Sequence, residues 1–165
     1  LATGTPLRKV IGDPNPDYTA SLVNELKYKN LGFRFQFDAV QGNENFNADF
    51  RTRQNVGNGK IAEQEYLGQL PRGYVLGVLP IEEFRIDDGS FVKLREISLN
   101  YRINKFKALK DLTLSVTGRN LFSFDNYKGY DPEVNAGGQS TILRGIDFGA
   151  IPIPRTISFG LSTKF

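Results

Sequence analysis

The 165-residue chain contains no cysteine, histidine, methionine or tryptophan. Without cysteine it can have neither a disulfide framework nor a cysteine nucleophile, and without histidine it can have no imidazole zinc site and no histidine general base. The chain also lacks any apolar run approaching the roughly 18 residues of a transmembrane helix. Its first residues, Leu1–Pro6, show no basic or apolar region of a signal peptide, and we expect them to lie inside a longer chain.

Charge is nearly balanced, with a net +3 at pH 7. The excess is spread along the chain, whereas nucleic-acid-binding proteins usually concentrate it in a run or stripe, so no nucleic-acid partner is expected. The 17 glycines, 8 prolines, 13 phenylalanines and 7 tyrosines favour strands and turns. A mean hydropathy of −0.34 is typical of soluble proteins, but strands of transmembrane β-barrels also average to mild polarity because they alternate.

Apolar and polar residues alternate with a period of two in several segments, each about as long as the roughly 9–11 residues that cross a bilayer at a tilt. The predicted strands are Tyr18–Tyr28, Phe33–Val40, Val92–Ile103, Leu112–Phe124 and Ile157–Phe165. The phase of the third strand reverses before Glu96, which indicates either a β-bulge near Arg95 or the point where the strand emerges from the apolar layer. In the fourth strand Gly118 and Asn120 interrupt the apolar side and Leu121 the polar side.

Short and long connections alternate between these strands. The short ones are Lys29–Gly32 and Asn104–Asp111, and the long ones cover about residues 43–90 and 125–154. This order is typical of outer-membrane barrels, with short periplasmic turns and long extracellular loops. We therefore predict extracellular loops at about 1–17, 43–90 and 125–154. A soluble antiparallel β-rich binding module also alternates on one face and stays open as an alternative.

Five strands cannot close a barrel, because their open edges would leave unpaired backbone groups in hydrocarbon. Either the chain is part of a larger barrel, or the long connections contain three more strands and the chain forms a small eight-stranded outer-membrane barrel.

Three stretches resemble segments of the SusC/RagA family of TonB-dependent outer-membrane transporters of Bacteroidetes: Ile11–Thr19, Phe91–Tyr101 and, most specifically, Gly118–Val134. Pro154–Leu161 is also similar to the final strand of that family. The resemblance implies an all-β fold in which the chain is the last five or so strands of an antiparallel transmembrane β-barrel of about 22 strands. The plug domain of such a receptor is absent from this chain.

The same resemblance implies TonB-dependent import of a bulky nutrient, an oligosaccharide or oligopeptide, across the bacterial outer membrane. The implied partners are a SusD/RagB-like surface lipoprotein, TonB through the missing N-terminal part, outer-membrane lipid, the barrel assembly machinery and the glycan or peptide substrate. No cofactor, metal site or catalytic residue is implied. Enzymatic hydrolysis would need a Ser–Lys pair or two carboxylates, and the spacing of Asp131 and Glu133 gives no sign of a preorganised pair.

Two groups of residues are candidate sites. Tyr127, Tyr130, Asp131 and Glu133 can contact substrate or a lid, since tyrosine rings stack on sugars or peptides and carboxylates accept hydrogen bonds. The alternative is a loop-structuring element in which Gly129 allows tight geometry and Pro132 fixes the backbone. Ile157, Phe159, Leu161 and Phe165 form the predicted barrel-assembly signal, although Thr163 stands where the family often has an apolar residue.

Charged residues on the polar parity of the strands are expected to line a lumen and to pair with one another or with the plug. They are Glu25, Lys27, Arg34, Asp38, Glu96, Arg102, Arg119 and Lys164. Arg155 shares parity with the apolar Ile157, and we expect it to extend towards water at the outer rim.

Overall fold

The computed structural model describes residues 8–104, 111–140 and 142–164. The chain divides into two compact units. The sheet unit comprises Asp17–Gln41, Ser90–Asn126 and Pro152–Phe165, and the loop unit comprises Leu1–Pro16, Gly42–Gly89 and Tyr127–Ile151. Among the described residues, no helix has the length and apolar character needed to cross a membrane.

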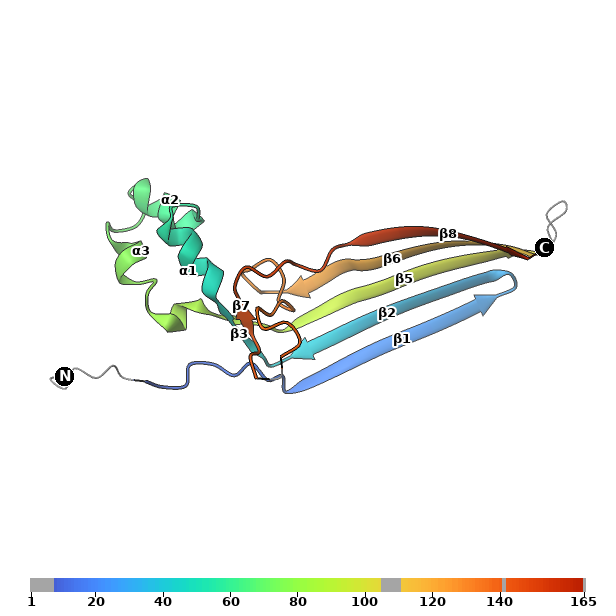
Figure 1. The fold of residues 1–165 in the computed structure, drawn as a ribbon, viewed down its shortest axis with the longest axis horizontal. Coiled ribbons are helices and arrows are strands. Elements are labelled where there is room, and N and C mark those ends of the chain that lie inside the picture. Colours follow the sequence, from blue (N-terminus) through green and yellow to red (C-terminus); the bar gives the residue numbers. More distant parts are fainter. Residues whose placement is uncertain (1–7, 105–110, 141, 165) are drawn as a thin grey trace. The chain divides into compact units, whose positions relative to one another are not determined.

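The sheet unit is one antiparallel sheet whose strands lie in the order β1-β2-β5-β6-β8 (Figure 1). The strands are β1 (Tyr18–Tyr28), β2 (Leu31–Gln41), β5 (Phe91–Ile103), β6 (Asp111–Asp125) and β8 (Thr156–Lys164). All five predicted strands are therefore confirmed. The long connections leave from one end of this sheet, because β2 and β6 end where β5 and β8 begin.

One face of this sheet is apolar across every strand. The register places Leu26 opposite Phe33, Phe33 opposite Leu99, Leu99 opposite Val116 and Val116 opposite Phe159. Such cross-strand apolar pairs stabilise the sheet, yet Phe159 is still 81% exposed. The opposite face carries the polar residues, as the alternation predicts.

The predicted β-bulge is present at Arg95. The pairing of β5 with both neighbours shifts between Leu94 and Glu96. Arg95 is the extra residue against β2, whereas against β6 it stands opposite two residues, Asn120 and Leu121. Leu94 faces Phe37 in the register, and the apolar face therefore continues across the bulge. Without the extra residue, the apolar side chains before the bulge would point to the polar face.

The irregularity in β6 has the same origin. Asn120 adopts a positive φ of 51°, and its side-chain oxygen accepts a hydrogen bond from Arg95 Nη1 at 3.2 Å. Leu121 in turn covers Gly118, where an added Cβ would lie 2.9 Å from Leu121 Cδ2. The left-handed residue thus turns Asn120 to the polar side and Leu121 to the apolar side, which explains both exceptions in the sequence pattern.

Asn120 is a position where the backbone decides which residues fit. We expect Asn120→Ala to destabilise the sheet by about 1–2 kcal/mol, because alanine is strained at positive φ and cannot accept the bond from Arg95. Asn120→Gly removes the strain but also the acceptor, so its loss is expected to be smaller. Urea unfolding of the two variants would show the difference, and equal losses would contradict the role of the positive φ.

The first short connection is tighter than predicted. Tyr28 pairs with Leu31, so the turn consists of Lys29 and Asn30, and β2 begins two residues before Phe33. Lys29 takes a positive φ of 52° to close it. Residues 105–110, which make up most of the other short connection, lie outside the described residues.

The long connections contain unpredicted secondary structure. Three short strands, β3 (Glu44–Asn47), β4 (Ile86–Asp88) and β7 (Ile146–Asp147), form a separate sheet in the order β4-β3-β7. With 4, 3 and 2 residues they are far shorter than a membrane-crossing strand of about 9 residues. Within the described residues, they do not supply the extra strands of an eight-stranded barrel.

Helices also occur in the segment predicted only as a loop, so the chain is mostly β rather than all β. They are α1 (Ala48–Asn55), α2 (Lys60–Tyr66), α3 (Tyr74–Gly77) and the 3₁₀ turn η1 (Glu82–Arg85). Asn47 begins α1, and its side chain accepts a hydrogen bond from Phe50 N at 3.0 Å. No apolar period marks α1, which is why the sequence pattern does not reveal it.

Candidate functional site

The polar face of the sheet carries a ladder of alternating charges. Arg34 on β2 lies 3.4 Å from Glu25 on β1 and 2.9 Å from Glu96 on β5. Glu96 also pairs with Arg119 on β6 at 3.1 Å. Each charge is balanced by a neighbouring strand, as expected for the wet side of such a sheet. The ladder therefore holds the strands in register and by itself marks no binding site.

Tyr127 anchors the start of the second long connection. Its side chain is buried, and its hydroxyl donates a hydrogen bond to Asp147 Oδ2 on β7 at 2.7 Å. The ring passes so close to Gly129 that an added Cβ there would lie 2.2 Å from Tyr127 Cε1. Glycine at this position is thus required by the position of the tyrosine ring.

A buried polar network continues from this anchor. Asp131 is buried, and its Oδ1 accepts a hydrogen bond from Glu133 N at 3.0 Å. Asn45 on β3 donates to the Pro132 carbonyl at 2.6 Å, and Lys128 lies 2.9 Å from Asp87 on β4. Side chains in 127–134 are therefore bonded to the small sheet of the loop unit.

The predicted contact residues do not form one surface. Tyr127 and Asp131 are buried and fit the alternative of a loop-structuring element. Tyr130 is 72% exposed, with the Arg53 guanidinium 5.1 Å from its ring centroid, and Glu133 is also exposed. Contact with substrate or a lid stays a prediction, and only this exposed pair presents its side chains to solvent.

The acid–base properties of the anchor follow from its burial. Desolvation raises the pKa of Tyr127 far above its usual range, and the bond to Asp147 adds to this effect. Burial also raises the pKa of Asp147 above its ordinary 3.8, against the lowering effect of the Tyr127 hydroxyl. The carboxylates of Asp49 and Asp131 raise it further, while Arg53 lowers it.

A raised pKa makes this unit more stable when Asp147 holds its proton. The contribution is fully present below the unfolded pKa of 3.8 and is lost as the pH rises through the higher folded value. Asp147→Asn keeps an acceptor for Tyr127 without a charge. The free energy of unfolding of the loop unit in the wild type, relative to this variant, is expected to be lower at about pH 7 than at about pH 3. A difference that does not change with pH would contradict the raised pKa.

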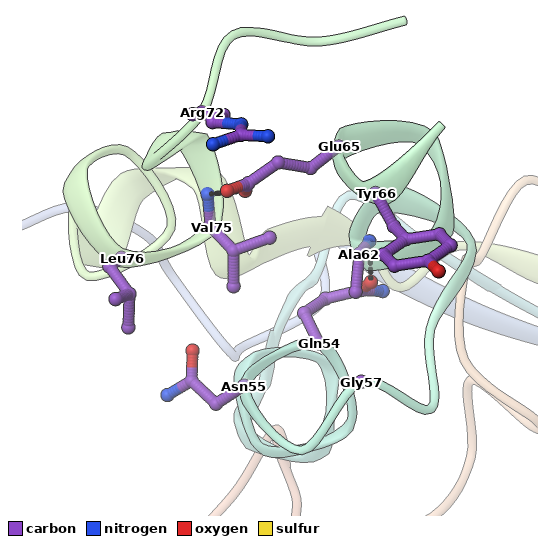
Figure 2. A pocket seen from close by; sticks show the side chains of 9 residues that line it. All are labelled: Gln54, Asn55, Gly57, Ala62, Glu65, Tyr66, Arg72, Val75 and Leu76. Atoms are coloured by element: carbon purple, nitrogen blue, oxygen red, sulfur yellow. Dashed lines mark hydrogen bonds between the residues drawn. The ribbon is translucent and has the colours of Figure 1, made fainter. Parts of the chain in front are cut away.

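One cleft of the loop unit lies among the three α-helices and has a volume of about 470 Å³ (Figure 2). Gln54 and Asn55 line it from the end of α1, Tyr66 from the end of α2, and Val75 and Leu76 from α3. Sequence reasoning missed this cleft, because no apolar period marks the helices that form it.

The predicted assembly signal lies partly within the described residues. Ile157, Phe159 and Leu161 share the apolar face of β8 and are 63%, 81% and 70% exposed. Phe165 lies outside the described residues. Recognition by the barrel assembly machinery stays a prediction.

No metal site is visible in the part of the chain that the structure describes, since no three histidine, cysteine, aspartate or glutamate side chains gather there. Near the start of the described residues, Asp13 and Asn15 form a local turn. Asp13 Oδ1 accepts hydrogen bonds from the backbone and side-chain nitrogens of Asn15, both at 2.9 Å, and these bonds lower the pKa of Asp13.

Comparisons with known proteins agree with the amphipathic sheet. No protein-family model matches the chain. TonB-dependent receptor P3 of Formosa agariphila is 32% identical over 96% of this chain and 17% of that receptor. TonB-dependent receptor SusC of Bacteroides thetaiotaomicron is 28% identical over 92% of this chain and 15% of that receptor. This chain is homologous to SusC/RagA-type TonB-dependent receptors.

The fold agrees with this relationship. A solved structure of the RagAB peptide importer in its closed-closed state matches with a TM-score of 0.72 at 19% identity, over 95% of this chain and 18% of that chain. The chain thus spans less than a fifth of the length of the receptors it resembles. TonB-dependent receptors of the outer membrane are transporters and not enzymes, in agreement with the prediction that this chain is not an enzyme.

Proposed function

We propose that this chain is part of a transporter that imports a bulky nutrient across the bacterial outer membrane with energy from TonB. The observation that carries the proposal is homology to SusC/RagA-type receptors over nearly the whole chain. The sheet supports it, because an apolar row continues across all five strands and stays exposed in this chain.

In this proposal the five strands are consecutive wall strands of a barrel of about 22 strands. The apolar face contacts lipid, and the face with the charge ladder lines the lumen. Because open strand edges are not viable in hydrocarbon, β1 and β8 would each pair with a further strand of the receptor. The loop unit and the N-terminal segment would lie on the extracellular side, and the plug and its contact with TonB would belong to the remainder of the receptor.

We infer the partner and the cargo of the receptor from the related proteins. The RagAB structures imply a RagB-like partner for members of this family, and we propose a SusD/RagB-like surface lipoprotein for this receptor. One relative is SusC, and one matching structure is that of the RagAB peptide importer. The proposed cargo is accordingly an oligosaccharide or an oligopeptide.

The intact mass of the native polypeptide, extracted from the outer-membrane fraction with detergent, tests this proposal. A barrel of this size with a plug requires about 100 kDa or more. A mass of 18.5 kDa in a detergent-dependent protein would contradict the proposal. If the polypeptide stays monodisperse without detergent, it is a soluble β-rich binding module. Nutrient uptake that persists without TonB would contradict the transport mechanism.

A further inference from the structure

The cleft among α1, α2 and α3 combines an apolar floor with an exposed aromatic rim. Val75 is only 7% exposed and closes the floor, whereas Tyr66 and Leu76 are 90% and 74% exposed. In the view of Figure 2, Tyr66 and Leu76 lie on opposite sides of the cleft. A tyrosine this exposed contributes almost nothing to packing within the chain, so its ring is available to a ligand.

Hydrogen bonds to side chains hold the walls in place. Gln54 Oε1 accepts hydrogen bonds from Ile61 N and Ala62 N at 3.1 and 3.0 Å, which joins α1 to α2. The two oxygens of Glu65 accept hydrogen bonds from Gly73 N at 2.7 Å and Val75 N at 2.8 Å, which joins α2 to α3. The cleft is therefore preformed, and binding would cost little ordering of the chain.

Two further polar side chains line the cleft, and both end in planar groups that are rich in hydrogen-bond donors. Asn55 and Arg72 line the cleft, and within the part of the chain that the structure describes their side chains form no hydrogen bond or ion pair. An amide both donates and accepts, and a guanidinium donates only. The carboxylate of Glu65 accepts hydrogen bonds from backbone N–H groups, which lower its pKa and keep it ionised.

These features match a sugar ring better than a peptide. A pyranose has an apolar face of C–H groups that stacks on an aromatic ring, and hydroxyls at its edge that both donate and accept. Peptides are bound as an added strand, as an amphipathic helix in an apolar groove, or as a polyproline segment on an aromatic-lined groove. The helical walls offer no strand edge, and among the described residues that line the cleft Tyr66 is the one aromatic side chain. A cleft of about 470 Å³ also lies within the usual range of small-ligand sites.

We propose that this cleft is a carbohydrate-binding site, in which Tyr66 stacks on a sugar ring and Asn55 and Arg72 bond its hydroxyls. The inference rests on the proposed import function and narrows the cargo to an oligosaccharide. It adds a binding site in the segment between β2 and β5, separate from Tyr130 and Glu133.

The test uses the full-length receptor, purified in detergent, with its partner lipoprotein absent. Calorimetric titration with a panel of hexasaccharides (α-1,4-glucan, β-1,3-glucan, β-1,4-mannan and β-1,4-xylan) is compared with titration by a mixture of octapeptides. We expect at least one hexasaccharide to bind. Tyr66→Ala should raise its Kd about tenfold, while Tyr66→Phe keeps the ring and stays within about twofold of the wild type.

Matched controls separate binding from folding. Leu67→Ala changes the neighbouring residue, which is 59% exposed and does not line the cleft, and should leave the Kd unchanged. Because Tyr66 is 90% exposed, Tyr66→Ala should not alter the unfolding midpoint of the receptor.

Each outcome bears on one proposal. Binding of no hexasaccharide, or of one with the same Kd in Tyr66→Ala, overturns the carbohydrate site but leaves TonB-dependent import intact. Octapeptide binding that is weakened by Tyr66→Ala shows that the cleft takes peptides, and also overturns it. Sugar binding that requires Tyr66 supports the site even if uptake proves independent of TonB, which would overturn only the proposed function.

Discussion

Phe159→Arg is expected to abolish or strongly reduce the folded receptor in the outer membrane. Phe159 lies on the apolar face of β8, opposite Val116, and is 81% exposed in this chain. If this face contacts lipid, an arginine near the bilayer midplane costs about 2–4 kcal/mol. The variant should therefore unfold at lower urea concentration in lipid vesicles and should lose the gel-mobility shift of a folded outer-membrane protein.

Ser158→Arg is the matched control for this change. Ser158 precedes Phe159 on the same strand, pairs with Thr117, and therefore points to the polar face. A charge there meets water or other polar groups, so the folded yield should stay close to that of the wild type. Equal losses from the two arginines would show that the two faces do not differ in their surroundings, which is incompatible with a lipid-facing wall.

Tyr127→Ala should open the loop unit, with a loss of about 3–4 kcal/mol in its local stability. The substitution removes a buried ring, which leaves a cavity, and it deprives Asp147 of its hydroxyl donor. Limited trypsin digestion of the full-length receptor reports this opening directly, because Lys128 follows Tyr127 and pairs with Asp87 in the closed arrangement. Cleavage after Lys128 should become much faster.

Two further variants distinguish packing from hydrogen bonding. Tyr127→Phe keeps the ring and loses only the donor, so its cost should be about 1–2 kcal/mol. Gly129→Ala should resemble Tyr127→Ala, because its Cβ would lie 2.2 Å from the tyrosine ring and displace it. Wild-type cleavage rates in Gly129→Ala would contradict the close packing of ring and glycine. Unchanged nutrient uptake in Tyr127→Phe would support a structural rather than a substrate-binding role.

The sequence was most informative in the sheet. Alternation alone placed all five strands, because a sheet with one apolar and one polar face imposes a period of two on every strand. Reversal of the phase before Glu96 indicated a bulge near Arg95 as one of two explanations, and the register of β5 shows that the bulge is present. The exchange of Asn120 and Leu121 was visible only as an irregularity, since it depends on the positive φ of Asn120 and its bond from Arg95.

The sequence was least informative in the loop unit. Its helices are short and are held by side-chain hydrogen bonds such as those of Gln54 and Glu65. No apolar period in the sequence therefore predicts them. Of the predicted contact residues, Tyr127 and Asp131 proved buried, and they form hydrogen bonds with Asp147 and with the backbone of Glu133. Nothing in the residue types distinguishes the buried Tyr127 from the exposed Tyr130, or the buried Asp131 from the exposed Glu133.

The amino-acid sequence by itself thus determined the strands, their two faces and the resemblance to SusC/RagA-type receptors. Alternation and short motifs depend only on residues that are close together in the chain. Tertiary structure decided which residues of the long connections are buried and which reach solvent. That choice depends on hydrogen bonds between residues far apart in the chain, such as Asn45 with Pro132 and Tyr127 with Asp147. Tertiary structure also created the cleft beside Tyr66, because its walls come from three helices that meet only in the folded chain.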